Sequence, residues 1–352
     1  MNATETAVRS AFRLQASFCR CLAAPFTAEL CSTIGLQLDR TTSVGRRVLE
    51  WQGQPNADGD SVPLRLAAGL HRIVRAGQAQ DLAKLYPPKR LPERRILWDT
   101  VQAALKEFDS DLMPWLDQPP QTNEVARSVY LMCGLLVISQ RYGLPLAIYE
   151  LGASAGLNLV LDRYRYRLGN IDVGSMDSKL TLAPLWKGGS PPSSVARILR
   201  RRGVDLMPLS IANANDRERL AAYVWPDHLE RLARITAASE IAAQSPPSID
   251  RGEAADWLEE TVAVTPEVGV CRVVLHTIAF QYFSAASREQ VQAQILRIGS
   301  MATDRAPFAW LRFEGDPSEV HVPLKLTVWP GGLEHVLAFG DAHGREVTWM
   351  AS

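Results

Sequence analysis

The residues best suited to chemistry lie in one stretch, ELGASAGLN, which starts at Glu150. The apolar run before it, residues 146–149, predicts a short buried strand that ends on this acid. Gly152 and Gly156 follow with three small residues between them, so the backbone can turn sharply and approach a ligand closely. A helical pattern begins at Leu157, and the start of a helix presents free N–H groups. The stretch therefore predicts a strand–turn–helix corner that cradles a phosphate or a nucleoside.

A histidine lies at the end of a second strong strand pattern. Residues 270–277 (VCRVVLHT) form a near-continuous apolar and β-branched run, which is typical of central parallel strands. His276 lies near its C-terminal end, where open α/β sheets bind ligands, and a histidine can titrate near neutral pH. We therefore expect His276 and Glu124 to be the catalytic bases, with Tyr282 and Tyr164 as alternatives. A packing role for His276 is weighed equally.

The polar run Gln121-Thr122-Asn123-Glu124 precedes a helix predicted from about residue 125 to residue 142. Thr122 or Asn123 can cap this helix, and Glu124 suits the positive end of its dipole. Alternatively the run borders the ligand site, because the helix leads directly into the strand that ends at Glu150. Both interpretations stay open, and under the second we expect Asn123 to contact the substrate.

Ser154 supports a rival interpretation. The turn around it reads GASAG and fits Gly-x-Ser-x-Gly, the turn that carries the nucleophile of many hydrolases. The order Ser154, then Asp205 or Asp216, then His276 also fits a catalytic triad. A hydrolase core needs strands upstream of this turn, however, and residues 1–140 show helical patterns only. We therefore keep a Ser-His-Asp hydrolase as a second alternative.

The elements that must position these residues alternate between strand and helix over residues 146–298. The pattern predicts an α/β fold with a doubly wound, mostly parallel sheet and a C-terminal antiparallel hairpin. Residues 1–140 predict an all-helical N-terminal cap domain, and residues 141–352 predict the sheet domain, with a β-hairpin inserted at about 164–190. After that insertion we expect a short helix at 195–202 and strands at 204–208, 248–250, 270–277, 308–314, 324–329 and 336–339.

This arrangement is similar to the class I S-adenosylmethionine-dependent methyltransferases, whose first strand ends in an acid followed by Gly-x-x-x-Gly or a close variant. Glu150 and the turn after it match that pattern. An NAD-binding corner usually carries Gly-x-Gly-x-x-Gly with its decisive acid on the second strand, so an acid directly before the turn favours S-adenosylmethionine. The resemblance implies that Asp205 binds the ribose hydroxyls and that Glu253, where the family usually has Asp, contacts the adenine.

The full set of expected contacts in the site is larger. The cofactor-binding residues are expected to be Glu150, Gly152, Ala153, Ser154, Gly156, Asn158, Asp205 and Glu253. The substrate-binding residues are expected to be Asn123, Tyr164 and Gln281. No metal is expected, because methyl transfer from a sulfonium is an in-line displacement in which the protein mainly positions two reactants.

Nearly the whole chain further resembles a bacterial family catalogued only as a domain of unknown function. The resemblance is carried by residues 121–124, 150–158, 162–166 and 329–332. It implies a helical cap joined to a methyltransferase-like core, and it implies no known reaction.

We therefore expect an S-adenosylmethionine-binding enzyme that transfers a methyl group to a small molecule. The first alternative is a cyclase or lyase that consumes the same compound. In that reaction the donor's own amine attacks its carbon chain and expels methylthioadenosine. A protein that binds the nucleoside without turnover is the third hypothesis. The identity of the product, S-adenosylhomocysteine or methylthioadenosine, distinguishes the first two.

The composition narrows the partners. The 352 residues carry 38 basic and 38 acidic side chains, and this balance argues against a nucleic-acid partner. The longest apolar run, near residues 131–138, is too short to span a bilayer. The five cysteines have no metal-type spacing with histidine, and the N-terminus lacks an apolar signal core. We expect a cytoplasmic protein without a membrane partner, and we allow for a homodimer.

Overall fold

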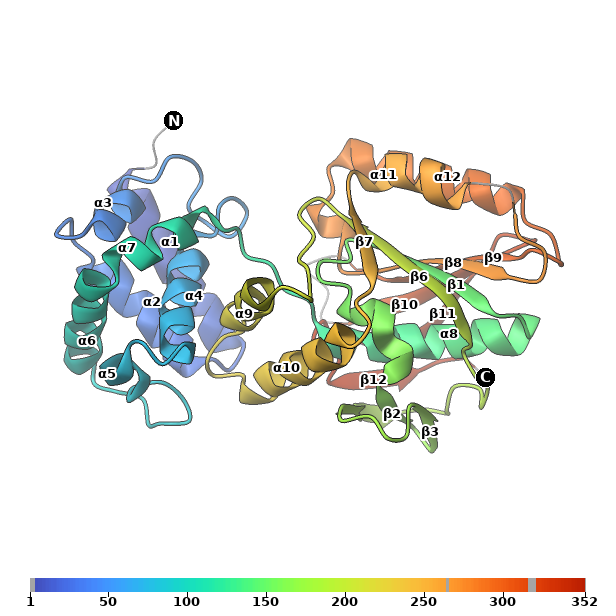
Figure 1. Cartoon of the computed structure of the whole chain (residues 1–352), viewed down its shortest axis with the longest axis horizontal. Helices are drawn as coiled ribbons and strands as arrows, with labels where there is room; N and C mark the ends of the chain where they lie inside the picture. Colours follow the sequence, from blue (N-terminus) through green and yellow to red (C-terminus); the bar gives the residue numbers. More distant parts are fainter. Residues whose placement is uncertain (1–3, 264–265, 316–320, 352) are drawn as a thin grey trace. The chain divides into compact units, whose positions relative to one another are not determined.

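The computed structural model describes residues 4–263, 266–315 and 321–351, and the chain falls into two compact units (Figure 1). The first unit comprises Met1–Thr122 together with Asn215–Ala233. The second unit comprises Asn123–Ala214 and Arg234–Ser352. A segment from the middle of the chain therefore folds with the N-terminal part.

The regular elements that the structure describes in the first unit are helices, joined by loops. Its helices are α1 (Glu5–Cys21), α2 (Pro25–Gln37), α3 (Ser43–Leu49), α4 (Val62–Arg75), α5 (Gln80–Ala83), α6 (Arg94–Glu107), α7 (Asp109–Leu112), a 3-10 turn at Pro114–Asp117 and α9 (Ala214–Ala222). The helix α10 (Leu229–Ala243) begins in this unit and ends in the second. The core is built from apolar side chains at helical spacing, as Leu66, Leu70 and Ile73 of α4 illustrate.

The segment 215–233 is held to the first unit by charged groups. The carboxylate of Asp227 accepts hydrogen bonds from the backbone N–H groups of Phe26, at 2.7 Å, and Thr27, at 3.0 Å. These are orphan donors at the start of α2, and an anion is favoured there. Arg75 of α4 forms an ion pair with Glu218 of α9 at 2.7 Å. Contacts over such sequence separations leave no periodic signal, so the sequence did not predict them.

The boundary between the units lies at residue 122 rather than at residue 140. The helix α8 (Ser128–Tyr142) belongs to the second unit because it packs on the sheet. The ring of Tyr130 stacks on Phe313 with 3.8 Å between centroids, and Gly134 lies directly against Leu311. Helical periodicity alone cannot separate a helix that covers a sheet from one that packs among other helices.

The second unit contains a nine-stranded sheet within its described residues, in the order β5-β12-β11-β10-β9-β8-β1-β6-β7. The strands are β1 (Leu146–Leu151), β5 (Leu185–Lys187), β6 (Ile198–Asp205), β7 (Ser248–Arg251), β8 (Cys271–Thr277), β9 (Phe308–Phe313), β10 (Val322–Trp329), β11 (Leu333–Gly340) and β12 (Glu346–Trp349). From β7 to β9 all neighbours pair in parallel, and β9 to β12 pair antiparallel. The expected α/β class with a large, mostly parallel sheet is confirmed.

Helices cover both faces of this sheet. The helices α11 (Ala254–Trp257) and α12 (Ala285–Ser300) lie on one face and α8 lies on the other (Figure 1). Paired residues in neighbouring strands point to the same face, so two rows can be followed across the sheet. Tyr149, Val274 and Trp310 form a row that packs with residues of α12. Glu150, Leu275 and Leu311 form the adjacent row, which faces α8.

The helix expected at residues 195–202 is wrong, because the structure has the strand β6 there. Its backbone pairs in parallel with β1. The arginine run of this strand is bound to acids: Arg200 pairs with Glu267, Arg201 with Asp162 at 2.6 Å, and Arg202 with Asp250 at 2.6 Å. Three consecutive charged residues are not typical of a strand pattern. The acids that neutralise them come together only in the folded chain, so the sequence did not indicate a strand here.

The connection from β1 to β6 forms a small sheet of its own, with the strands β2 (Arg165–Leu168), β3 (Ile171–Gly174) and β4 (Thr181–Leu182). The strands β2 and β3 pair antiparallel, and β4 lies parallel to β2. Tyr164 and Tyr166 anchor this insertion, because both rings are fully buried. Among the residues that the structure describes, no helix is long and apolar enough to cross a membrane.

Candidate functional site

The turn after β1 has an unusual backbone. Gly152, Ser154 and Gly156 all adopt left-handed conformations, with φ of +68°, +54° and +70°. A Cβ on Gly152 would lie 2.9 Å from the Cβ of Ala279, and one on Gly156 would lie 2.6 Å from Pro247 Cγ. Both positions therefore require glycine for conformation and for space. Ser154 occupies a third such position without being glycine, which costs roughly 1–2 kcal/mol.

The turn lies at the point where the order of the strands in the sheet reverses. From β1 the chain proceeds to β6 and then β7 on one side, whereas β8 and β9 lie on the other side. This places a topological switch point between β1 and β8, and open α/β sheets bind ligands outside the carboxyl ends of the strands at such a point. The contact of Gly152 with Ala279, just beyond β8, shows that the two strand ends meet there.

Glu150 is the chemically distinctive residue of this corner. Its side chain is almost fully buried, and Oε1 accepts one long hydrogen bond from Asn158 Nδ2 at 3.4 Å. Burial raises the pKa of Glu150 to about 8, the Asn158 hydrogen bond opposes the rise, and the Asp205 charge adds to it. Within the described chain, Glu150 Oε2, Asn158 Oδ1 and Ser154 Oγ are buried without a hydrogen-bond partner. Buried polar atoms are seldom left so, and this cluster has spare capacity to accept hydrogen bonds.

Asp205 ends β6 and Glu253 follows β7, and the two acids differ in environment. Asp205 Oδ2 accepts from the N–H of Ser154 at 2.8 Å, and Oδ1 accepts from the N–H of Met207 at 2.9 Å. Asp205 therefore fixes the turn after β1 to the end of β6. Glu253 is exposed and immediately precedes α11. The backbone joins the two positions, because the N–H of Gly252 donates to the carbonyl of Asp205 at 3.1 Å.

Asn123 and Tyr164 both bind the backbone of Leu157. Asn123 Oδ1 accepts from the Leu157 N–H at 2.9 Å, and the Tyr164 hydroxyl donates to the Leu157 carbonyl at 2.7 Å. Leu157 opens a 3-10 segment, Leu157–Arg163, where a regular helix was expected. Ala153, inside the turn, is completely buried. These side chains support the turn, and Asn123 connects it to the start of α8.

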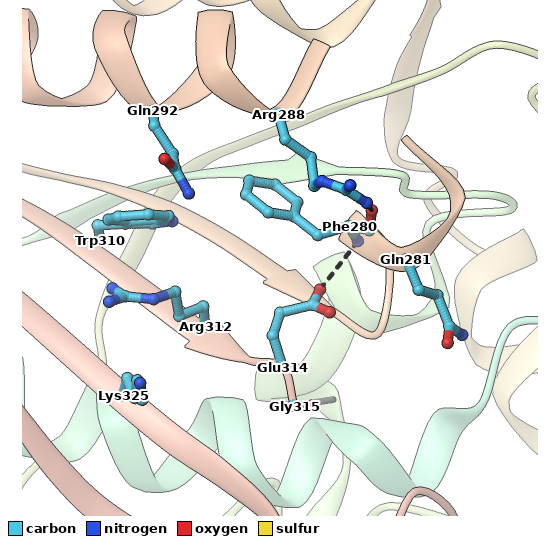
Figure 2. A pocket seen from close by; sticks show the side chains of 9 residues that line it. All are labelled: Phe280, Gln281, Arg288, Gln292, Trp310, Arg312, Glu314, Gly315 and Lys325. Carbon is cyan, nitrogen blue, oxygen red and sulfur yellow. Dashed lines mark hydrogen bonds between the residues drawn. The ribbon is translucent and has the colours of Figure 1, made fainter. Parts of the chain in front are cut away.

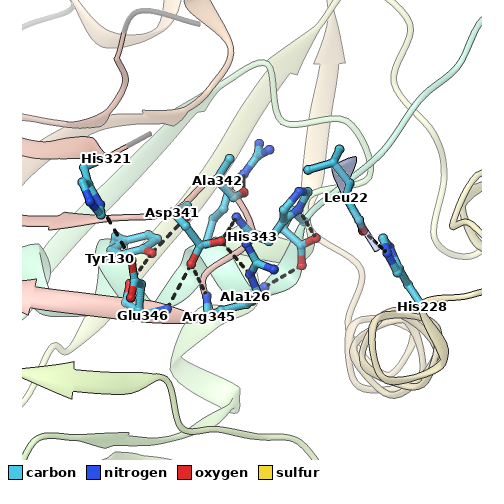
Figure 3. A network of polar contacts seen from close by, with 12 residues as sticks. Leu22, Ala126, Tyr130, His228, His321, Asp341, Ala342, His343, Arg345 and Glu346 are labelled. Atoms are coloured by element: carbon cyan, nitrogen blue, oxygen red, sulfur yellow. Dashed lines mark hydrogen bonds and ion pairs between the residues drawn. The ribbon is translucent and has the colours of Figure 1, made fainter. Parts of the chain in front are cut away.

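Figure 3 shows a polar network in a C-terminal turn that includes Asp341, His343 and Arg345. Glu124, at the same helix start as Asn123, lies beside this turn. Its side chain accepts from the N–H of Ala126 at 3.2 Å, and Oε2 lies 3.7 Å from His343 Nδ1. The carboxylate of Asp341 organises the turn by accepting from the backbone N–H groups of His343, Arg345 and Glu346. Glu124, rather than Thr122 or Asn123, caps the first turn. Asn123 reaches the corner, and its contact with a substrate stays a prediction.

The structure separates His276 from the corner. Its ring lies in the row facing α12, on the opposite side of the sheet from Glu150, and is completely buried. Nδ1 lies 2.7 Å from Glu314 Oε1, and Trp310 Nε1 donates to Nε2 at 2.9 Å. Because an indole N–H can only donate, Nε2 accepts and the ring proton lies on Nδ1. With both nitrogens occupied, His276 has no lone pair for a substrate proton, and the expected base role is corrected to a packing and hydrogen-bonding role.

Glu314 is the hub of this second cluster. Its Oε1 also accepts from the N–H groups of Ala279, at 2.7 Å, and Phe280, at 3.3 Å. Burial alone would raise the pKa of Glu314, but the His276 hydrogen bond and these two backbone donors outweigh burial and lower it. The loop after β8 is thereby pinned, including Ile278, which has a left-handed φ of +48°.

A cavity of about 400 Å³ lies against this loop (Figure 2). It is lined by Phe280, Gln281, Arg288, Gln292, Trp310, Arg312, Glu314, Gly315 and Lys325. Gln281 was expected to contact substrate, and it does line the cavity. Tyr282, expected as an alternative base, is 80% exposed and is not among the lining residues.

Sequence reasoning missed the basic and aromatic lining of this cavity. A usable signal was present, because Trp310 and Arg312 alternate along β9, Glu314 continues the alternation just after it, and residues two apart share one face. What the sequence could not supply was the pairing of Arg312 with Lys325 across β9 and β10. Among the described residues no group of three or more His, Cys, Asp or Glu side chains could hold a metal ion.

The fold and the corner together define an α/β protein with a left-handed, glycine-rich turn at the switch point of an open sheet. The chain belongs to the bacterial family described as "uncharacterized protein conserved in bacteria" (DUF2332), which it matches over residues 9–349. The expected membership in a bacterial family of unknown function is thereby confirmed. Among curated proteins, the comparison gives no match.

Proposed function

We propose that the chain binds S-adenosylmethionine at the corner formed by Glu150 and the following turn, and transfers its methyl group to a small-molecule acceptor. The parallel strands support a nucleoside ligand, because β7-β6-β1-β8-β9 is the order of a mononucleotide-binding sheet. The observation that carries the proposal is the carboxylate of Glu150, which is buried at the switch point with one oxygen unpartnered. The resemblance to class I methyltransferases, including the helical unit as a cap, belongs to this proposal.

The residues present fit such a ligand. Glu150 Oε2 and Asn158 Oδ1 can accept hydrogen bonds from an ammonium group, and a cationic ligand would favour the ionised form of Glu150. Gly152 allows close approach of the backbone, and Asp205 holds the turn in shape. When bound, the donor supplies a methyl group already activated on a sulfonium. The chain's own residues then have to exclude water and position the two reactants.

One loop links the cavity to the corner, and this link supports a transfer between two substrates. Ala279 touches Gly152, and the next residue, Phe280, lines the cavity. The cyclase that expels methylthioadenosine needs no acceptor cavity, and it stays the alternative. The hydrolase is disfavoured, because Ser154 Oγ has no partner among the described residues and both nitrogens of His276 are occupied.

Titration calorimetry with S-adenosylmethionine tests the proposal. The wild-type protein should bind in the micromolar to millimolar range, and Glu150→Gln should weaken binding at least tenfold. The affinity of the wild type should rise between pH 6 and 7.5, because the ionised fraction of Glu150 increases as the pH approaches its pKa of about 8. Glu150→Gln should show no such rise. Glu240→Gln, on an exposed position of α10, is the matched control.

The two reactions are separated by mass analysis of the products after incubation with candidate acceptors. S-adenosylhomocysteine identifies methyl transfer, and methylthioadenosine identifies the cyclase. A folded protein that gives no binding heat with S-adenosylmethionine at millimolar concentration would sink both.

A further inference from the structure

The cavity against the loop after β8 carries more positive charge than its surroundings neutralise. Three of its lining side chains are cationic, namely Arg288, Arg312 and Lys325. Two carboxylates oppose them: Glu314 lines the cavity, and Glu334 pairs with both Arg312 and Lys325. Counted over the residues that the structure describes, three positive charges against two negative charges leave one positive charge in excess.

Arg288 carries the excess. Its guanidinium donates to the backbone carbonyls of Phe280 and Phe283, each at 3.2 Å. Within the described ranges, no carboxylate lies within ion-pair distance of Arg288. Arg288 and Gln292 are four residues apart on α12, so they share one helix face, and Figure 2 shows both side chains descending from that helix toward the cavity. A guanidinium placed in this way is suited to a planar carboxylate, which it can bind through two parallel N–H groups.

Arg312 is held by contacts with two neighbouring side chains. Its guanidinium lies 3.8 Å from the centroid of the Trp310 ring and donates to the Thr327 hydroxyl at 3.1 Å. Burial lowers the pKa of Arg312, so the charge is held in surroundings that favour an anion nearby. Arg312 and Lys325 lie opposite each other on paired strands, and two like charges in that position repel. Glu334 relieves part of this repulsion, and a bound anion would relieve more of it.

The remaining walls are apolar or amide. Phe280 and Trp310 present aromatic carbon, with centroids 6.3 Å apart and rings tilted at 44°, and Gln281 and Gln292 contribute amides. The volume of about 400 Å³ lies in the range of small-molecule sites. Cationic, aromatic and amide groups together suit a ligand with a flat apolar body and one negative charge.

We infer that this cavity binds the acceptor and that the acceptor is a small aromatic carboxylate, anchored by Arg288 with Lys325 opposite. The assignment as acceptor rests on the proposed transferase function. The link is the loop from Ile278 to Tyr282, which contacts the corner through Ala279 and the cavity through Phe280. A monoanion matches the single excess charge better than a dianion does.

Saturation-transfer NMR with three probes tests the inference: benzoate, its neutral analogue benzamide, and phenyl phosphate. Benzoate should bind with millimolar or better affinity, at least tenfold more tightly than benzamide and no more weakly than phenyl phosphate. Arg288→Gln and Lys325→Gln should each weaken benzoate binding at least tenfold. Arg288→Lys should retain part of the affinity, because it keeps the charge and loses only the fork. Arg297→Gln, on the same helix but outside the cavity, is the matched control.

The outcomes separate this inference from the proposed function. Equal binding of benzoate and benzamide, or unchanged binding in folded Arg288→Gln and Lys325→Gln, overturns the anion site, and tighter binding of phenyl phosphate overturns the carboxylate. Glu150→Gln should leave benzoate binding unchanged, since its side chain lies on the other face of the sheet. If the wild-type protein binds benzoate but does not bind S-adenosylmethionine, the proposed function alone is overturned.

Discussion

Glu150 is a buried carboxylate and Glu314 a largely buried one, and both lie at the carboxyl ends of parallel strands, yet their surroundings act in opposite directions. Glu314 accepts from His276 and two backbone N–H groups, and its pKa is lowered in spite of burial. Glu150 accepts one long hydrogen bond from Asn158, and its pKa is raised to about 8. A carboxylate that the fold itself satisfies stabilises a loop, whereas one left short of donors is available to a ligand.

The largest effect should come from removing the satisfied carboxylate. Glu314→Ala should destabilise the second unit by about 3–5 kcal/mol, because it leaves His276 and two backbone donors buried without an acceptor. Urea unfolding followed by circular dichroism measures the loss. Glu259→Ala, a mostly exposed acid, is the control and should change the free energy of unfolding little. A loss below about 1 kcal/mol for Glu314→Ala would show that the hub is not structural.

Removing the charge of Glu150, by contrast, should stabilise the protein. The folded pKa of Glu150 lies above its ordinary value of 4.5, so the folded state holds the proton more tightly than the unfolded state. Stability is therefore fully present below about pH 4.5 and declines as the pH rises toward 8. Glu150→Gln should abolish this decline, and its advantage over the wild type should grow by up to about 1.4 kcal/mol per pH unit in that interval.

Unfolding measured at pH 5, 6, 7 and 8 checks the prediction. If the free energies of unfolding of the wild type and Glu150→Gln depend on pH in the same way, the charge of Glu150 is compensated in the folded protein and the prediction is wrong. Combined with weaker ligand binding, a gain in stability would mark Glu150 as a residue kept for function at the expense of the fold.

The comparison also shows what the sequence can and cannot predict. The strands β1 and β8 and the turn after Glu150 were predictable, because buried strands and glycine turns leave local patterns. The roles of the acids were not. Glu314 lies 38 residues from His276 in the chain, and nothing local indicates that the two side chains meet.

Two other predictions about the fold failed for the same physical reason, namely contacts between residues far apart in the sequence. The three arginines of β6 are neutralised by Glu267, Asp162 and Asp250, which are distant in the sequence. Without these partners the charged run resembles a surface helix, and a helix was predicted there. The segment 215–233 joins the first unit through contacts some 200 residues apart, which no periodicity records. Face assignment was within reach, because strand alternation puts His276 and Glu150 on opposite sides once the register is known.

The smallest effect concerns a feature that both regions share. Ser154 and Ile278 each hold a left-handed backbone without being glycine, and the neighbouring carboxylate Asp205 or Glu314 fixes each loop. At Ser154 the hydroxyl is also buried without a partner. Ser154→Ala should stabilise the protein by about 1 kcal/mol, because it removes only the buried hydroxyl. Ser154→Gly should add a gain of similar size from relief of the backbone, reduced by the flexibility of glycine in the unfolded chain.

The same variants test what Ser154 does. If the corner holds a nucleoside, Ser154→Ala should keep S-adenosylmethionine binding within about threefold of the wild type, since the hydroxyl is at most one hydrogen bond. A hydrolase nucleophile would behave differently, because its removal abolishes turnover while leaving substrate binding intact. Loss of an esterase activity in Ser154→Ala, with the fold preserved, would reverse the contrast between the two regions. It would make the strained, unsatisfied turn at Ser154 the reacting centre, in place of the carboxylate at Glu150.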